Sequence, residues 1–283
     1  MSQPVLSKTH SQPATAGHPR YLWLTYSTVI LLAIASAAGV FYPAIYERDA
    51  VSWAVQGQGQ DFANLVLVVP ALLISGLLAM RGSRRAELVW LGVMFYVAYS
   101  YVVYAFDLTF NRLFLVYVAV LGCSVYGLIY GLAAGESTSL ARALQGKRSV
   151  QATRIMLGIS VMLFYLLWLR DIVPNLIANT VPAGLLDVGL PTNPVHVLDI
   201  GLTLPAMILT VIGLGKGQPI SYRIAPALLV FVALMAAAIF SMTVYLMQAG
   251  LPGDPALLGV FGVLSGIYLI LVIWYLRDTP DHP

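Results

Sequence analysis

Two related stretches of sequence decide the fold: DFANLVLVVP at residues 61–70 and HVLDIGLTLP at residues 196–205. Both begin with a polar residue, continue as an apolar run and carry a matching proline, Pro70 and Pro205. Around them the chain aligns with itself without a gap over about forty residues, at a constant offset of 135. This pattern predicts that the chain arose by duplication.

The duplication extends beyond these stretches. The same offset places VMFYVA at 93–98 on LLVFVA at 228–233. Two further segments share only an Arg-Asp pair, Arg48-Asp49 and Arg170-Asp171. The alternative is that segments rich in Leu, Val and Ala align by chance. The matched prolines, the basic turns that follow them and the Arg-Asp pairs favour duplication.

The composition is that of a membrane protein. Hydrophobic residues make up 59% and charged residues 10%, with a mean hydropathy of +0.84, whereas soluble domains contain roughly 25% charged residues. An apolar run of about 20 residues crosses the hydrocarbon core as a helix. Eight such runs are present: Tyr21–Tyr42, Phe62–Met80, Leu88–Phe106, Leu113–Ala134, Ile155–Leu169, Val197–Leu214, Ile224–Gln248 and Ala256–Leu276. The sequence predicts an all-α integral membrane protein with eight transmembrane helices, the fifth being short.

The charged residues predict the orientation. With the N-terminus placed inside, twelve Lys and Arg fall inside and three outside, while eight Asp and Glu fall outside and four inside. Cytoplasmic loops are enriched in Lys and Arg, so both termini are expected in the cytoplasm. The size and the short loops are typical of a bacterial inner-membrane protein. Each half then contains four spans, and the two halves form a parallel repeat.

These observations divide the chain into five parts. We expect a disordered cytoplasmic tail at 1–20, a first four-helix repeat at 21–134, a cytoplasmic linker at 135–154, a second repeat at 155–276 and a cytoplasmic tail at 277–283.

No catalytic or cofactor motif stands out, and nothing indicates a nucleic-acid partner. Cys123 is the only cysteine, which excludes an internal disulfide and a two-cysteine metal site. All Asp, Glu, Lys and Arg are expected at helix ends or in loops. That placement argues against a proton-driven carrier, which usually holds an ionisable group near the midplane.

One candidate site lies at the predicted outer face. His196 and Asp199 are one helical turn apart, and Asp61 is the repeat partner of His196. If the halves face each other, the three side chains converge and could bind a divalent metal or act in acid-base chemistry. The alternative is that Asp61 caps the helix that follows it, as Asn193 before Pro194 can cap the next.

The rest of the outer face is rich in charges and irregular sequence. We expect ion pairs among six residues: Arg48, Asp49, Asp107, Arg112, Arg170 and Asp171. The stretch 171–194 is too apolar for a solvated loop and too rich in Pro and Gly for a span. It is therefore predicted to be a lid, a re-entrant piece or a surface segment.

Tyrosines concentrate in the third and fourth segments. A buried tyrosine needs a partner for its hydroxyl group, so Tyr96, Tyr99 and Tyr126 are candidates for a ligand pocket. The alternative is ordinary helix packing.

Three functions are compatible with these features. The first is binding or transport of a lipid-like or weakly polar molecule through an outer pocket. The second is an accessory subunit that packs against the helices of a membrane-protein partner through small residues, at 35–39 and 236–238. The third is a membrane-embedded enzyme that uses His196, Asp199 and Asp61. The lipid bilayer is a partner in all three cases.

Overall fold

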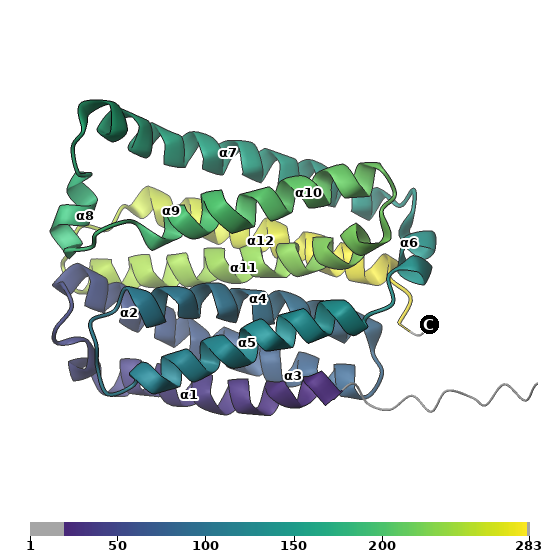
Figure 1. Ribbon diagram of the computed structural model, residues 1–283, viewed down its shortest axis with the longest axis horizontal. Coiled ribbons are helices and arrows are strands. Elements are labelled where there is room, and N and C mark those ends of the chain that lie inside the picture. Colours follow the sequence, from purple (N-terminus) through teal and green to yellow (C-terminus); the bar gives the residue numbers. More distant parts are fainter. Residues whose placement is uncertain (1–19, 282–283) are drawn as a thin grey trace, which may run out of the picture.

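The computed structural model describes residues 20–281, and this part of the chain is helical without any strand. Eight of its helices are long and apolar enough to cross a membrane. They run along the long axis of the molecule, and the start of α1 (Leu24–Phe41) lies at the same end as the C-terminus (Figure 1). Among the described residues, this confirms the prediction of an all-α chain with eight helices that are long and apolar enough to span a membrane. The predicted disordered tail falls, except for Arg20, outside the described residues.

The first four spans consist of α1, the continuous helix Val51–Met80, α4 and α5. The second of them combines α2 (Val51–Ala63), the π-helical turn η3 (Asn64–Val68) and α3 (Val69–Met80). The third and fourth are α4 (Arg84–Phe106) and α5 (Phe114–Ala134). Two 3₁₀ turns, η1 (Arg20–Trp23) and η2 (Pro43–Tyr46), flank α1.

The last four spans follow the same order. They are α7 (Arg148–Ala178), the continuous helix Pro194–Gly215, α11 (Pro219–Gln248) and α12 (Pro255–Asp278). The helix Pro194–Gly215 combines α9 (Pro194–Leu198), the π-helical turn η4 (Asp199–Thr203) and α10 (Leu204–Gly215). Two short helices, α6 (Thr138–Leu144) and α8 (Ala183–Val188), lie at opposite ends of the bundle (Figure 1).

Two predicted spans are longer in the structure than expected, and the predicted linker is largely helical. The second span begins at Val51 rather than Phe62, so most of the expected first outer loop is helical. The fifth span is not short, because α7 has 31 residues and includes Pro174. The expected linker 135–154 contains α6 and the first turns of α7.

The two π-helical turns occupy equivalent positions. The turn η4 follows η3 by 135 residues, and α10 follows α3 by the same number at both ends. Each turn precedes a proline, Pro70 or Pro205. Proline has no N–H for the carbonyl four residues earlier, and its ring crowds that carbonyl. An added residue in the turn relieves this conflict, and such π-bulges are frequent at functional sites.

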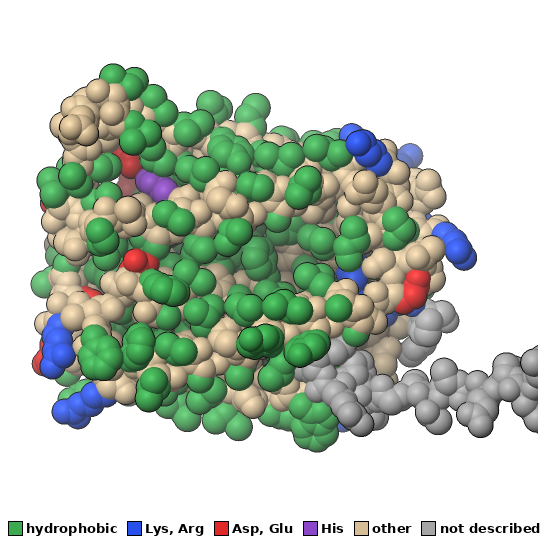
Figure 2. Space-filling view, viewed as in Figure 1, with side chains coloured by type: hydrophobic (Ala, Val, Ile, Leu, Met, Phe, Trp, Pro, Cys, Tyr) green, Lys and Arg blue, Asp and Glu red, His purple; other side chains and the backbone are tan. Residues whose placement is uncertain are grey.

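Helix α4 lies at the centre of the bundle and packs against α3, α5 and α11. Within the apolar part of α4, 72% of the residues are buried, whereas in the apolar parts of α7 and α12 only 17% are. Apolar side chains cover the visible sides of the molecule, and charged side chains gather near the two ends (Figure 2). The exposed apolar faces of α7 and α12 are therefore suited to contact with a lipid bilayer.

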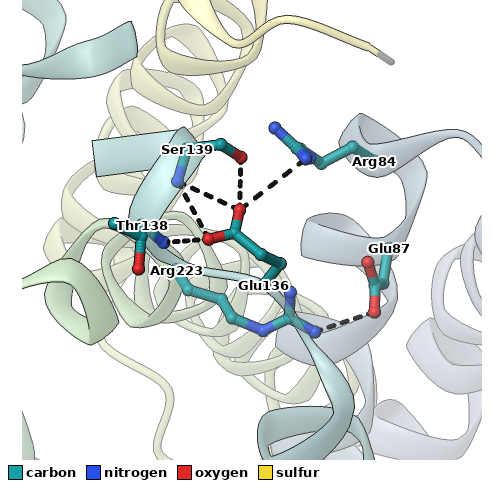
Figure 3. A network of polar contacts seen from close by, with 6 residues as sticks. All are labelled: Arg84, Glu87, Glu136, Thr138, Ser139 and Arg223. Carbon is teal, nitrogen blue, oxygen red and sulfur yellow. Dashed lines mark hydrogen bonds and ion pairs between the residues drawn. The ribbon is translucent and has the colours of Figure 1, made fainter. Parts of the chain in front are cut away.

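A buried ion pair joins three segments at the end that holds the C-terminus. The Arg223 guanidinium on α11 lies 2.7 Å from the Glu87 carboxylate on α4 (Figure 3). It also donates to the Gly131 carbonyl on α5 at 2.8 Å. Nearby, Glu136 accepts hydrogen bonds from the Ser139 hydroxyl and from backbone N–H groups at the start of α6. These bonds, led by the Ser139 hydroxyl, lower the pKa of Glu136 to about 2.

Candidate functional site

A cavity of about 670 Å³ lies between the first four spans and the last four. Residues from α2 and α4 form one wall, and residues from α7, α9, η4, α10, α11 and α12 form most of the rest. The short helix α8 contributes Gly184, Leu185 and Val188. The cavity falls within the range of roughly 300–1,000 Å³ that is typical of small-molecule sites, and like them it is mostly apolar with a few polar groups.

The most distinctive polar group in this cavity is Asp199. Its Oδ1 accepts a hydrogen bond from the Tyr99 hydroxyl at 3.0 Å, and its Oδ2 accepts one from the Trp168 Nε1–H at 2.9 Å. All three residues line the cavity, and Asp199 is 9% exposed. The carboxylate thus joins α4, α7 and the π-helical turn η4 at one point.

The local sequence explains the position of Asp199. Asn193 caps the helix that begins at Pro194, because its side-chain oxygen accepts from the N–H groups of Val195 and His196 at 2.9 and 3.2 Å. This confirms the capping role expected for Asn193. Asp199 is the first residue of η4, which ends just before the helix segment that contains Pro205.

His196 lies beside this cluster without entering it. Its ring is half-buried and packs on the Trp168 indole, with a centroid distance of 4.6 Å. The described residues show no hydrogen bond or ion pair between His196 and Asp199. Its visible role is therefore packing against Trp168, the residue that donates to Asp199.

Asp61 belongs to a different cluster. It is 0% exposed and accepts hydrogen bonds from the Tyr46 hydroxyl and, at 3.0 Å, from the Tyr104 hydroxyl. The Tyr104 ring is stacked on Tyr101 and meets Tyr117 edge-on, with centroid distances of 5.0 and 5.4 Å. Asp61 lies in the last turn of α2 and does not cap a helix N-terminus, which corrects the alternative prediction for this residue.

The predicted metal site is not assembled. Across residues 20–281, no group of three His, Cys, Asp or Glu residues is placed to hold a metal ion. The reason is that Asp61 and Asp199 are each surrounded by aromatic hydroxyl or indole donors, and His196 is turned towards Trp168. The structure therefore does not bring His196, Asp199 and Asp61 together as a coordinating group.

The candidate tyrosines separate into three environments. Tyr99 lines the cavity, whereas Tyr96 is fully buried and donates to the Asn64 Oδ1 at 3.0 Å. Tyr126 is 58% exposed and stacks on Tyr130, at a centroid distance of 6.4 Å. The pocket that Tyr96 and Tyr126 were expected to share is not formed, because Tyr96 lies in the closed core and Tyr126 lies on the surface of the bundle.

The small-residue patches are used inside the bundle. In the stretch 35–39, Ala35 and Ser36 are fully buried, and in 236–238 so are Ala236 and Ala238. These residues let helices approach closely within this chain. They do not offer the exposed surface that a partner helix would need.

The six charged residues of the outer face were expected to form ion pairs, and within residues 20–281 none of them has an oppositely charged atom within 4.0 Å. Two of them, Arg48 and Asp49, instead hold loop backbone in place. Asp49 accepts from the Thr109 N–H at 2.7 Å, and Arg48 donates to the Phe110 carbonyl at 3.2 Å. These bonds tie the segment before α2 to the segment between α4 and α5. Arg170 and Asp171 lie within α7.

Asp107, at the C-terminal end of α4, gives a testable pH dependence. Partial burial raises the pKa of its carboxyl from 3.8 to about 6, and its Oδ2 is buried without a hydrogen-bond partner. Because the folded pKa is raised, the contribution of Asp107 to stability is fully present below pH 4 and is lost as pH rises through about 6. We expect Asp107→Asn to raise the melting temperature at pH 8 and to leave it unchanged near pH 4.

Thermal unfolding of the purified protein between pH 4 and 8 measures this difference. Glu47→Gln, a change at an exposed carboxylate, serves as the control for a general effect of charge. An Asp107→Asn curve that stays parallel to wild type over the whole range would contradict the assignment.

Sequence reasoning missed Trp168, Tyr46 and Asn64. Trp168 lies near the end of the fifth apolar run, where an aromatic residue is ordinary at a membrane interface. One signal in the sequence could have pointed to Asn64. It lies 135 residues before Asp199, the offset of the sequence alignment, and each of the two residues begins a π-helical turn.

Comparison of the chain with protein-family models, with curated proteins and with solved structures finds no match.

Proposed function

We propose that this chain is an inner-membrane protein that binds, and carries, a lipid-like or weakly polar small molecule in the cavity between its two halves. The observation that supports this function best is the cavity itself. It has a volume of about 670 Å³, an apolar wall and one polar cluster built from Tyr99, Trp168 and Asp199. A molecule with an apolar body and a single polar end would fit such a site.

The proposal includes a parallel repeat of two four-helix halves. It is supported by the equivalent π-helical turns, by the matched bounds of α3 and α10, and by the even number of spans in each half. Substrate sites of duplicated transporters lie at the interface between repeats. The cavity has this position, because α2 and α4 belong to the first half and α7 to α12 to the second.

The proposal also places both termini in the cytoplasm. The basic turns at 81–85 and 215–219 lie between spans, at the end that holds the C-terminus. The positive-inside tendency favours this end as the cytoplasmic one. The cavity, which includes residues next to α8 at the opposite end, would then open towards the outer face.

The segment 179–193 would act as a cover for the cavity. It contains α8, which has no buried residue of its own yet places Gly184, Leu185 and Val188 on the cavity. A short helix held by few internal contacts is suited to open and close.

Filling the cavity tests the function. Ile239 lines it, so Ile239→Trp should occupy the space of a ligand, and we expect the bound molecule to be lost or its affinity to fall at least about tenfold. Native mass spectrometry and organic extraction of protein purified in mild detergent measure the occupancy. Ile30→Trp on the exposed face of α1 is the matched control. Equal occupancy in wild type and Ile239→Trp would overturn the proposal.

A further inference from the structure

We propose that the molecule bound in this cavity is an organic cation with an apolar body, and that Asp199 is its counter-ion. This inference rests on the proposed function, and it adds the charge of the ligand. It follows from the charge balance of the cavity wall.

The cavity wall carries one charged residue and no basic one. Asp199 is the only Asp, Glu, Lys, Arg or His among the residues that line it. An anionic ligand would meet no opposite charge there and would be repelled by the carboxylate. A cationic ligand would supply the charge that the wall lacks.

Asp199 has no cationic partner in the part of the chain that the structure describes. Among residues 20–281, no Lys, Arg or His nitrogen lies within 4.0 Å of its carboxylate. Its two hydrogen bonds come from neutral donors, the Tyr99 hydroxyl and the Trp168 indole. A buried charge is costly unless it is paired, and an ionisable residue in a transmembrane segment usually marks a functional partner.

The neutral donors hold the carboxylate in position without saturating it. A carboxylate offers about four acceptor sites on its two oxygens, and Tyr99 and Trp168 occupy one site on each oxygen. The remaining sites are available to an ammonium or amine N–H. The protein thus presents Asp199 as an oriented acceptor at the edge of an apolar space.

Aromatic rings complete this environment. Trp168 packs against Phe164 at a centroid distance of 5.9 Å, and Tyr99 packs against Phe231 at 5.3 Å. All four rings line the cavity. Ring faces attract cations, most strongly where water is excluded, so a delocalised or quaternary cation would be stabilised beside Asp199.

Asp61 provides an internal comparison. It is also a buried carboxylate held by two aromatic donors, Tyr46 and Tyr104, but it does not line the cavity and is fully enclosed. Replacing Asp61 by Asn makes the same chemical change at a carboxylate that does not itself line the cavity, and its partner Tyr104, which does line it, keeps an oxygen acceptor. Asp61→Asn is therefore the matched control for Asp199→Asn.

The test uses two aromatic probes of similar kind, the cation tetraphenylphosphonium and the neutral molecule triphenylphosphine oxide. Their binding to the full-length protein in nanodiscs is measured by equilibrium dialysis, and empty nanodiscs correct for partition into lipid. We expect wild type and Asp61→Asn to bind the cation at least about tenfold more tightly than the neutral probe. Asp199→Asn should lose this preference and retain the neutral probe.

The outcomes separate the two proposals. Three results together would overturn the cation inference: both probes bind wild type equally, Asp199→Asn leaves the cation affinity unchanged, and Ile239→Trp abolishes binding. The last of these would still show that the cavity binds ligands. If neither probe binds wild type, both proposals are overturned. Size-exclusion profiles and melting temperatures of each variant establish that a loss of binding does not reflect unfolding.

Discussion

Replacing Gly39 by alanine is expected to destabilise the protein by about 3 kcal/mol or more, the upper range for overpacking a closed core. Gly39 lies on α1 against the Asp61 carboxylate. A methyl group at this position would sit 2.6 Å from the Asp61 Cγ and 2.9 Å from the Tyr46 hydroxyl oxygen. Asp61 cannot retreat easily, because Tyr46 and Tyr104 hold it and it is 0% exposed. Thermal or denaturant unfolding in detergent measures the loss.

A double-mutant cycle tests whether the clash with Asp61 is the cause. Asp61→Ala alone should also destabilise, since it leaves the buried Tyr46 hydroxyl without its acceptor, at about 1–3 kcal/mol, and leaves the Tyr104 hydroxyl with only the Gly57 carbonyl at 3.3 Å. Once the carboxylate is gone, the added methyl group has space. We therefore expect Gly39→Ala to cost much less in the Asp61→Ala background.

Gly122→Ala on α5 is the matched control, because a methyl group there would meet no atom within 4 Å. It should change the free energy of unfolding by less than about 1 kcal/mol, within the range of helix propensities. Additive effects of Gly39→Ala and Asp61→Ala would show that the two residues are not in contact.

The eight spans were predictable because lipid imposes a simple demand. Each helix needs about 20 apolar residues, and each apolar run found in the sequence coincides with a helix long enough to span. The ends of the spans were less predictable. Val51–Ala63 contains three glutamines and Asp61, which lowers its hydropathy, so it resembled a loop. Gln60 and Asp61 are buried against protein rather than lipid, and hydropathy does not distinguish these two environments.

The fifth span shows a second limit. The apolar run ends at Arg170-Asp171, yet α7 continues to Ala178 and includes both residues. Their side chains are exposed. A helix that extends past the apolar core keeps its backbone hydrogen bonds, and its charged side chains are solvated by water. The first charged residues after an apolar run therefore do not mark the end of the helix.

The candidate site was located in part. The spacing of His196 and Asp199 identified the correct turn, and Tyr99 was among the tyrosines singled out. The partners of Asp199 were not identifiable, because Tyr99 and Trp168 lie 100 and 31 residues away in sequence. Only the packing order of the helices brings them together, and periodicity within one helix contains no information on that order.

The expected convergence of Asp61 with His196 failed for a related reason. Equivalent positions in a repeat need not face a common axis. Asp61 is satisfied by Tyr46 and Tyr104 within its own half, and Asp199 by one donor from each half. The two π-helical turns lie 135 residues apart, and the clusters around them differ. In our proposal the second cluster binds the ligand and the first supports the fold.

The second large effect is expected at Arg223. Its guanidinium is 1% exposed and is held by Glu87 at 2.7 Å and by the Gly131 carbonyl at 2.8 Å (Figure 3). Arg223→Ala would leave Glu87 without this partner. Breaking a buried pair by removing one member costs about 3–5 kcal/mol, because the other charge stays in place. Unfolding by heat or denaturant, at fixed detergent concentration, measures the change.

Removing both charges should be milder than removing one. In Arg223→Met with Glu87→Gln, no unpaired charge remains and the methionine fills part of the space, so we expect at least half of the lost stability to return. Arg142→Ala on the exposed side of α6 is the control, and it should shift stability by less than about 1 kcal/mol, as exposed charges generally do. Recovery in the double variant would assign the loss to the Glu87 charge that has lost Arg223. If the double variant were as unstable as Arg223→Ala, the loss would instead arise from the missing guanidinium contacts to the Gly131 carbonyl and the surrounding core.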